Sequence, residues 1–152
     1  MHLSSKLRPD LVLIAPAVEG RDALFRAFGR RLEEAGLVSS GDDVVERLLE
    51  RESILSTGIG AGVAVPHAQV PGLGQLLMIV SVHPEGLPYP SLDGRPVRLV
   101  FCLLGDASTA ADHLAGLARL ARLARRTEGL ERLVAATSGE EFLARLSQLE
   151  GL

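Results

Sequence analysis

A histidine, His67, follows Pro66 near the end of the segment STGIGAGVAVPHA, which runs from Ser56 to Ala68. Val63 and Val65 alternate as in a strand, and proline cannot donate to a sheet ladder. We therefore expect the strand to end at Pro66 and to expose His67. A neutral imidazole in such a position is a nucleophile that works near neutral pH. Taken alone, however, a histidine there is more often an ordinary surface residue.

Three glycines, Gly58, Gly60 and Gly62, alternate just before this strand. Their spacing is neither G-x-G-x-x-G nor G-x-x-x-x-G-K, so it indicates neither a dinucleotide-binding fold nor a P-loop. One interpretation is a tight hairpin whose backbone needs unusual dihedral angles. The other is a loop whose amides, unhindered by Cβ atoms, approach a phosphoryl group closely. The pattern leaves both interpretations open.

Three further histidines could join His67. His113 lies near the start of an expected helix, on the face that should meet a sheet, where a structural role at the core edge is the simpler interpretation. His83 precedes Pro84 at the expected end of another strand, which favours a role in a turn. His2 belongs to the N-terminal segment, where order is usually lowest.

A zinc site made of His67, His113 and Cys102 is the rival arrangement. These residues lack the i, i+4 or C-x-x-C spacing of zinc ligands, and the single cysteine lies within an apolar strand, where it behaves as a small apolar residue. There is also no G-x-S-x-G motif to indicate a serine hydrolase. We therefore expect neither a metal nor a cofactor.

The elements that must position these residues follow from hydrophobic periodicity. We expect strands at 11–18, 63–65, 76–83 and 97–105, and helices at 21–35, 40–51, 110–125, 128–136 and 138–146. The strand at 97–105 is the most apolar and should be central, and Asp93-Gly94 suits a hairpin-type turn in the connection before it. This order predicts an α/β fold of one domain, residues 1–152 with a core from about 11 to 147, in which helices pack on a mixed β-sheet.

Composition argues against a nucleic-acid-binding, membrane-spanning or secreted protein. The net charge of −3 gives no global basic field that would favour nucleic acid. Four arginines, Arg119, Arg122, Arg125 and Arg126, recur at helical spacing and are expected to form a solvated helix face. No apolar run reaches the ~18 residues of a membrane span, and the N-terminus lacks the layout of a signal peptide. A cytoplasmic protein without membrane insertion is the expectation.

The motifs together resemble the signature of enzyme IIA domains of the bacterial phosphoenolpyruvate-dependent phosphotransferase system, of the type with fructose, mannitol and nitrogen-related members. The resemblance spans nearly the whole chain, from about Leu11 to the last helix. The residues that carry it are Arg51-Glu52, STGIG at 56–60, GVAVPH at 62–67, DGRPV at 93–97 and His113-Leu114.

This resemblance implies roles for individual residues. His67 would be phosphorylated by the phosphocarrier protein HPr and would pass the group to a sugar-specific enzyme IIB. His113 would be the second histidine of the site, hydrogen-bonded to the acceptor ring or its phosphoryl group, and Arg51 would be the arginine of the site. The implied fold is the mannitol-type enzyme IIA fold, a mixed β-sheet flanked by helices on both faces.

The chemistry suits such a role. An imidazole nitrogen both attacks and leaves near pH 7, so the phosphoryl group stays transferable. Arg51 can balance its charge, since charge-assisted hydrogen bonds are roughly twice as strong as neutral ones. Further donors are expected from the phosphoryl-binding loop, whose residues are Ser56, Thr57, Gly58, Gly60 and Gly62.

Two functions fit this family resemblance. The first, which we favour, is a phosphocarrier in sugar uptake; the second is a nitrogen-related regulatory enzyme IIA whose phosphorylation state controls binding to target proteins. A third, an interaction domain without phosphorylation, like the cytoplasmic domain of anion exchangers, is disfavoured by the intact set of His67, Arg51 and His113. The sequence does not separate the first two, because free-standing enzyme IIA chains occur in both classes.

Overall fold

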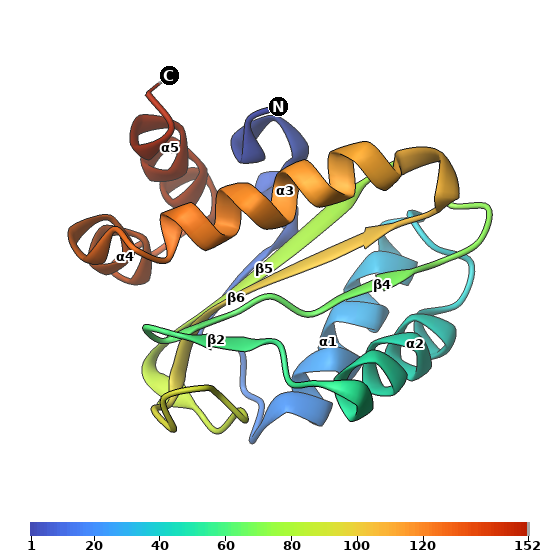
Figure 1. The fold of residues 1–152 in the computed structure, drawn as a ribbon, viewed down its shortest axis with the longest axis horizontal. Helices are drawn as coiled ribbons and strands as arrows, with labels where there is room; N and C mark the ends of the chain where they lie inside the picture. The colour runs from blue at the N-terminus through green and yellow to red at the C-terminus, as the bar shows by residue number, and fades with distance from the viewer. Residues whose placement is uncertain (152) are drawn as a thin grey trace.

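The computed structural model describes residues 1–151 and confirms the predicted α/β fold, a mixed sheet with helices on both faces (Figure 1). The sheet is six-stranded, in the order β1-β5-β6-β3-β2, with β4 pairing β6 beyond the end of β3. The strands are β1 (Val12–Ile14), β2 (Gly58–Gly60), β3 (Val63–Ala64), β4 (His67–Gln69), β5 (Leu77–Leu87) and β6 (Val97–Gly105).

The central strand is β6, as its apolar sequence predicted. It pairs antiparallel with β5 on one side and parallel with β3 and then β4 on the other. Successive side chains of a strand point to opposite faces, so a strand buried between two helix layers must be apolar throughout. Phe101, for example, packs against Phe142 of α5 with ring centroids 6.2 Å apart, and the neighbouring Cys102 is fully buried.

The helices form two layers. In Figure 1, α1 and α2 lie together against one face of the sheet, and α3 crosses the other face towards α4 and α5. Their bounds are α1 (Arg21–Glu34), α2 (Gly41–Ile54), α3 (Ala110–Leu123), α4 (Thr127–Val134) and α5 (Gly139–Leu149).

Two local features fix α1 against α2. A Cβ atom on Gly29 would lie 2.5 Å from the Gly41 carbonyl oxygen, so the two helices cross more closely than any larger residue would allow. Ser40 caps α2 by accepting a hydrogen bond from the Asp43 amide at 3.1 Å, an interaction typically worth about 1 kcal/mol. The position of α2 matters because this helix carries Arg51.

Some element boundaries differ from those predicted. The first strand stops at Ile14, where Ala15 has a φ of +46° and leaves the extended region. Strand β5 does not end at His83 but passes Pro84 and reaches Leu87. Proline is tolerated there because β1 already ends at the Ile14–Val82 pair, so that side of β5 needs no further donor.

The two ends of the described chain are held together by hydrogen bonds. The Glu150 carboxylate accepts hydrogen bonds from the amides of Leu3 and Ser4, at 2.6 and 2.8 Å. Leu3 and Leu7 are buried in the hydrophobic core. The N-terminal segment is therefore anchored beside the end of α5. None of the helices described is long and apolar enough to span a bilayer.

Candidate active site

His67 is the first residue of β4, a short strand at the edge of the sheet. As predicted, the strand before Pro66 ends there, since β3 stops at Ala64, but pairing with β6 resumes at His67, opposite Leu103. Proline fits the gap because its carbonyl still accepts from the Leu103 amide at 3.0 Å, while its missing N–H is not required. The His67 side chain is half-buried.

One nitrogen of the His67 ring is occupied by the backbone. Nδ1 lies 2.8 Å from the Val65 carbonyl oxygen. Because a carbonyl can only accept, Nδ1 must carry the proton, and in the neutral ring Nε2 then holds the free lone pair. This contact leaves Nε2 as the ring nitrogen with an available lone pair.

His113 of α3 meets His67 ring to ring. The ring centroids are 5.5 Å apart and the planes are inclined by 72°. Burial lowers the pKa of His113, and electrostatic repulsion from His67 lowers it further. The structure therefore places a neutral imidazole beside the free edge of His67 at physiological pH.

Gly105, the last residue of β6, allows His113 to come so close. A Cβ atom at this position would lie 3.2 Å from His113 Nδ1 and 2.5 Å from the Thr109 hydroxyl. Sequence reasoning missed Gly105, although a glycine at the end of an apolar strand is a signal of close approach.

Arg51 lies in the last turns of α2, which packs on β4. One helical turn earlier, Arg47 Nη1 lies 3.5 Å from the carbonyl oxygen of Gln69, the last residue of β4. Residues four apart share a helix face, so Arg51 lies on the side of α2 that meets the strand begun by His67. Arg51 is half-buried and forms no ion pair with any residue between 1 and 151.

The glycine-rich loop is only partly near His67. The Val65 amide donates to the Thr57 carbonyl at 2.9 Å, which brings Ser56 and Thr57 alongside Pro66 and His67. Gly60 and Gly62 lie towards the other end of the hairpin. The Gly62 carbonyl accepts from the Leu99 amide, and Leu99 is about 13 Å along β6 from Leu103, the partner of His67.

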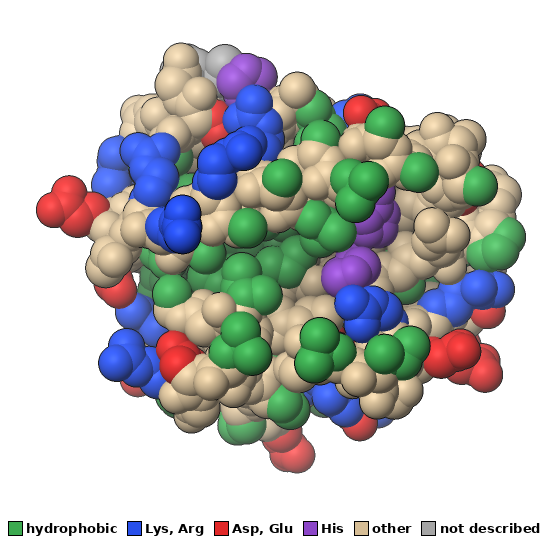
Figure 2. Space-filling view, viewed as in Figure 1, with side chains coloured by type: hydrophobic (Ala, Val, Ile, Leu, Met, Phe, Trp, Pro, Cys, Tyr) green, Lys and Arg blue, Asp and Glu red, His purple; other side chains and the backbone are tan. Residues whose placement is uncertain are grey.

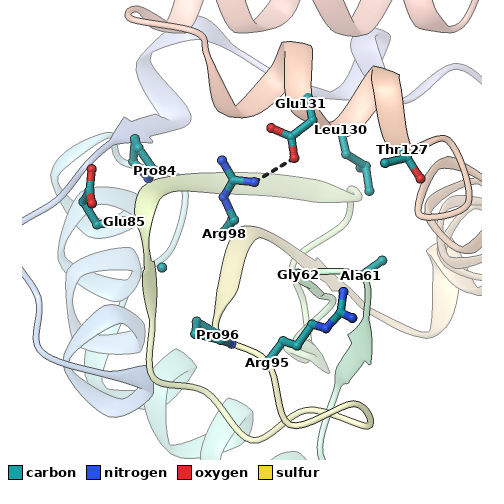
Figure 3. A pocket seen from close by; sticks show the side chains of 11 residues that line it. Ala61, Gly62, Pro84, Glu85, Arg95, Pro96, Arg98, Thr127, Leu130 and Glu131 are labelled. Carbon is teal, nitrogen blue, oxygen red and sulfur yellow. Dashed lines mark hydrogen bonds and ion pairs between the residues drawn. The ribbon is translucent and has the colours of Figure 1, made fainter.

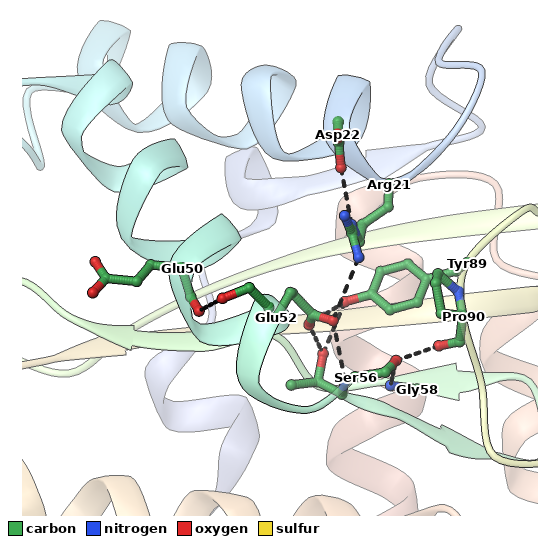
Figure 4. Close-up of polar contacts among 10 residues, drawn as sticks. Arg21, Asp22, Glu50, Glu52, Ser56, Gly58, Tyr89 and Pro90 are labelled. Atoms are coloured by element: carbon green, nitrogen blue, oxygen red, sulfur yellow. Dashed lines mark hydrogen bonds and ion pairs between the residues drawn. The ribbon is translucent and has the colours of Figure 1, made fainter.

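A buried polar network fixes the junction between α2 and this loop (Figure 4). The carboxylate of Glu52 accepts hydrogen bonds from the Thr57 hydroxyl, from the Thr57 amide at 3.2 Å and from the Tyr89 hydroxyl at 2.7 Å. Arg21 Nη1 lies 3.9 Å from the same carboxylate. Burial raises the pKa of Tyr89 above its usual value, and the Glu52 charge raises it further. The network anchors Thr57 to the residue that follows Arg51.

Both histidines are half-buried, and the pocket drawn in Figure 3 lies elsewhere. This pocket of about 400 Å³ is lined by Arg95, Arg98 and Glu131 among others, and includes neither histidine (Figure 3). Two exposed apolar side chains are close in sequence to the candidate site residues. Leu114, next to His113, is 69% exposed, and Leu55, four residues after Arg51 at the end of α2, is 64% exposed.

The zinc arrangement considered from the sequence is not assembled. Cys102 is fully buried, and burial raises the pKa of its thiol well above the usual value. Within residues 1–151, no group of three His, Cys, Asp or Glu side chains is placed to hold a metal ion.

Residues 5–149 match the family described as "Phosphoenolpyruvate-dependent sugar phosphotransferase system, EIIA 2". The chain belongs to this family. It is thus an enzyme IIA component of a phosphotransferase system, as the sequence resemblance indicated. The family assignment covers the elements that carry His67, His113 and Arg51.

Individual relatives support the family and the fold. A nitrogen regulatory protein of Bradyrhizobium diazoefficiens is 31% identical over 148 residues, covering 97% of this chain and 95% of that protein. The crystal structure of nitrogen regulatory protein IIA-Ntr from Neisseria meningitidis has a TM-score of 0.86 and 32% identity, covering 95% of this chain and 98% of that one. Enzyme IIAMtl of Escherichia coli, solved in complex with phosphorylated enzyme IIBMtl, has a TM-score of 0.76 at 22% identity, covering 94% and 98%, and supports the fold alone.

Proposed function

We propose that this enzyme IIA is a phosphocarrier that accepts a phosphoryl group from phospho-HPr on Nε2 of His67 and passes it to a sugar-specific enzyme IIB. The observation that carries the proposal is the hydrogen bond between His67 Nδ1 and the Val65 carbonyl. It leaves the other ring nitrogen, Nε2, with a free lone pair.

The transfer step is a displacement at phosphorus. The lone pair of His67 Nε2 forms the new P–N bond while the P–N bond of the donor's phosphohistidine breaks, and the donor ring leaves with the electron pair. The phosphorylated His67 ring keeps its Nδ1 proton and so gains positive charge, which the Val65 carbonyl oxygen stabilises at 2.8 Å. Transfer to enzyme IIB runs the same displacement in reverse, with His67 as the leaving group.

The surroundings of His67 supply positioning and charge. Arg51, free of internal ion pairs within residues 1–151, would balance the charge of the phosphoryl group. His113 would donate a hydrogen bond to it, and the backbone at Ser56 and Thr57 lies next to the strand that carries His67. In phosphoryl transfer most of the catalysis comes from such positioning and electrostatics.

Partial exposure of the site supports exchange between proteins. A partner's phosphorylated residue must reach His67 in line, and the exposed Leu114, next to His113, offers apolar contact. The solved assembly of enzyme IIAMtl with phosphorylated enzyme IIBMtl, on the same fold, supports an enzyme IIB as one such partner.

A second function is favoured by the full-length similarity to nitrogen regulatory proteins. In this alternative His67 is phosphorylated in the same way, but the phosphoryl group serves as a signal that controls binding to a target protein. Both functions need the same acceptor chemistry and differ in the fate of the phosphoryl group.

The test is the intact mass of the protein after incubation with phosphoenolpyruvate, enzyme I and HPr. We expect wild type to gain one acid-labile phosphoryl group and His67→Ala to gain none. Addition of a sugar-specific enzyme IIB should then discharge the wild-type protein. A label that remained on His67→Ala would make another residue the carrier, and a phosphoryl group that no enzyme IIB removed would favour the regulatory function.

A further inference from the structure

The outer face of α3 is apolar near His113 and cationic farther along. Leu114, Ala118, Ala121 and Arg122 are all exposed, and their spacing places them along one side of the helix. An exposed stripe of leucine and alanine is unusual on a helix whose opposite side packs on the sheet, where polar residues are the rule. The stripe starts directly beside the histidine pair.

The arginines of this region fall into two groups. Arg119 lies 3.6 Å from the Glu150 carboxylate, and Arg126 donates to the Leu149 carbonyl at 2.5 Å, so both contribute to holding the end of α5. Arg122 and Arg125 are exposed and form no ion pair with other residues of the 1–151 range. The last turn of α3 and the turn after it thus present two cations to solvent.

These cations lie on the same face of the molecule as the site. Figure 2 shows basic side chains gathered over the region where Figure 1 places the C-terminal half of α3, on a face where histidine side chains are also visible. The net charge of the chain is −3, so this patch is opposite in sign to the protein as a whole. Cations in the last turn of a helix complement its dipole, but that effect explains neither the exposed apolar stripe nor its continuity with the site.

Helix geometry brings the patch within reach of a partner. Arg122 is nine residues beyond His113, which corresponds to about 14 Å along the axis of α3, and it lies on the outer side of the helix, whereas His113 lies on the side towards the sheet. A typical protein interface covers about 800 Å² on each partner. A protein whose phosphorylated residue reaches His67 would therefore extend over Leu114 and Ala118 to Arg122 and Arg125.

We propose that the outer face of α3 is the docking surface for a phosphodonor protein that places an apolar side chain against Leu114 and a cluster of carboxylates against Arg122 and Arg125. This inference rests on the proposed function, because the donor is the protein that must approach His67. Charge complementarity would act mainly on the rate of encounter, and its effect would weaken as salt rises.

The experiment compares two double charge reversals with the same change of net charge. Arg122→Glu/Arg125→Glu alters the proposed surface, and Arg26→Glu/Arg30→Glu alters exposed arginines of α1, on the opposite side of the sheet. Phosphoryl transfer is measured from the phosphorylated HPr-type carrier of the same organism, at low and at high salt. Phosphoramidate, a small phosphodonor that needs no docking surface, serves as the donor in a parallel assay.

We expect Arg122→Glu/Arg125→Glu to lower kcat/KM for the protein donor about tenfold or more at low salt, with kcat little changed and the loss shrinking at high salt. The α1 variant should stay within about twofold of wild type, and phosphoramidate should label all three proteins equally. Equal kcat/KM for the two variants would overturn the inference.

Two further outcomes distinguish failure of the docking surface from failure of the proposed function. If phosphoramidate and the protein donor both fail to label wild type at His67, the proposed function itself fails. If transfer is unaffected but Arg122→Glu/Arg125→Glu weakens binding of a duplex oligonucleotide, the surface serves nucleic acid and protein docking there is refuted.

Discussion

His67 and His83 both lie in strands beside a proline, but their surroundings are opposite. His67 opens the edge strand β4, binds the backbone through Nδ1 and keeps Nε2 free. His83 lies within β5, is 6% exposed, and has its Nε2 2.7 Å from the Ser81 hydroxyl. The comparison shows that the place of a strand in the sheet decides whether a histidine ring keeps an accessible nitrogen, as in His67, or is enclosed in the core, as in His83.

The largest expected difference is in stability. His83→Ala should cost about 3 to 4 kcal/mol, because it leaves a cavity in the core and removes the partner of the buried Ser81 hydroxyl. His67→Ala, at a half-buried edge position, should cost less than about 1 kcal/mol. Urea denaturation measures both values, and similar costs for the two variants would contradict the comparison.

Lowering the pH should destabilise the folded protein through protonation of His83. Burial lowers its pKa from 6.5 to about 4. The unfolded state therefore binds more protons than the folded state in this interval, so the contribution to stability is complete above pH 6.5 and is lost as the pH falls towards 4. The loss should be at most about 3.5 kcal/mol, since one pKa unit corresponds to about 1.4 kcal/mol. In His83→Gln this part of the pH dependence should be missing, and an unchanged slope would assign it to other groups.

Variants of Arg51 test whether this arginine assists phosphoryl transfer at His67. Arg51→Ala should slow phosphoryl transfer about 30-fold, equivalent to about 2 kcal/mol, because the charge of the phosphoryl group loses its counterion. Arg47→Ala, one turn away on the same helix face, serves as the matched control and should change the rate less than about threefold. Arg51→Lys should recover part of the rate. A wild-type rate for Arg51→Ala would remove Arg51 from the site.

The smallest expected effect is a pKa shift at His113. Replacing His67 by alanine removes the repulsion between the two rings, so the pKa of His113 should rise. It should still stay below 6.5, since burial is the larger cause of the shift. Titration of the His113 ring by NMR measures this. No change would mean that the two imidazoles do not interact electrostatically.

The sequence predicted those features that depend on local pattern. The apolar run of β6 predicted a central strand, and Ser40 with Asp43 marked the start of α2. The motif around His67 predicted the family. It also singled out His113, which the structure brings next to His67, and Arg51, which lies on the face of α2 that meets β4.

The features that the sequence did not predict depend on pairing between distant segments. The resumption of pairing at His67 requires knowing that β6 runs alongside, and the continuation of β5 past His83 requires knowing that β1 ends at Ile14, opposite Val82. The contact of Glu52 with Tyr89 joins residues 37 positions apart, and no periodicity signals it. Such relations are set by the register of the sheet.

The anchoring of Leu3 and Ser4 by Glu150 has an architectural consequence. The chain enters and leaves this unit at neighbouring points, as Figure 1 shows for the two termini. A unit closed in this way can be joined to other polypeptides, or inserted between them, without pulling its strands apart. If it were tethered through these neighbouring ends, the whole unit could reorient as one body and present the surface around His67 to different partner proteins in turn.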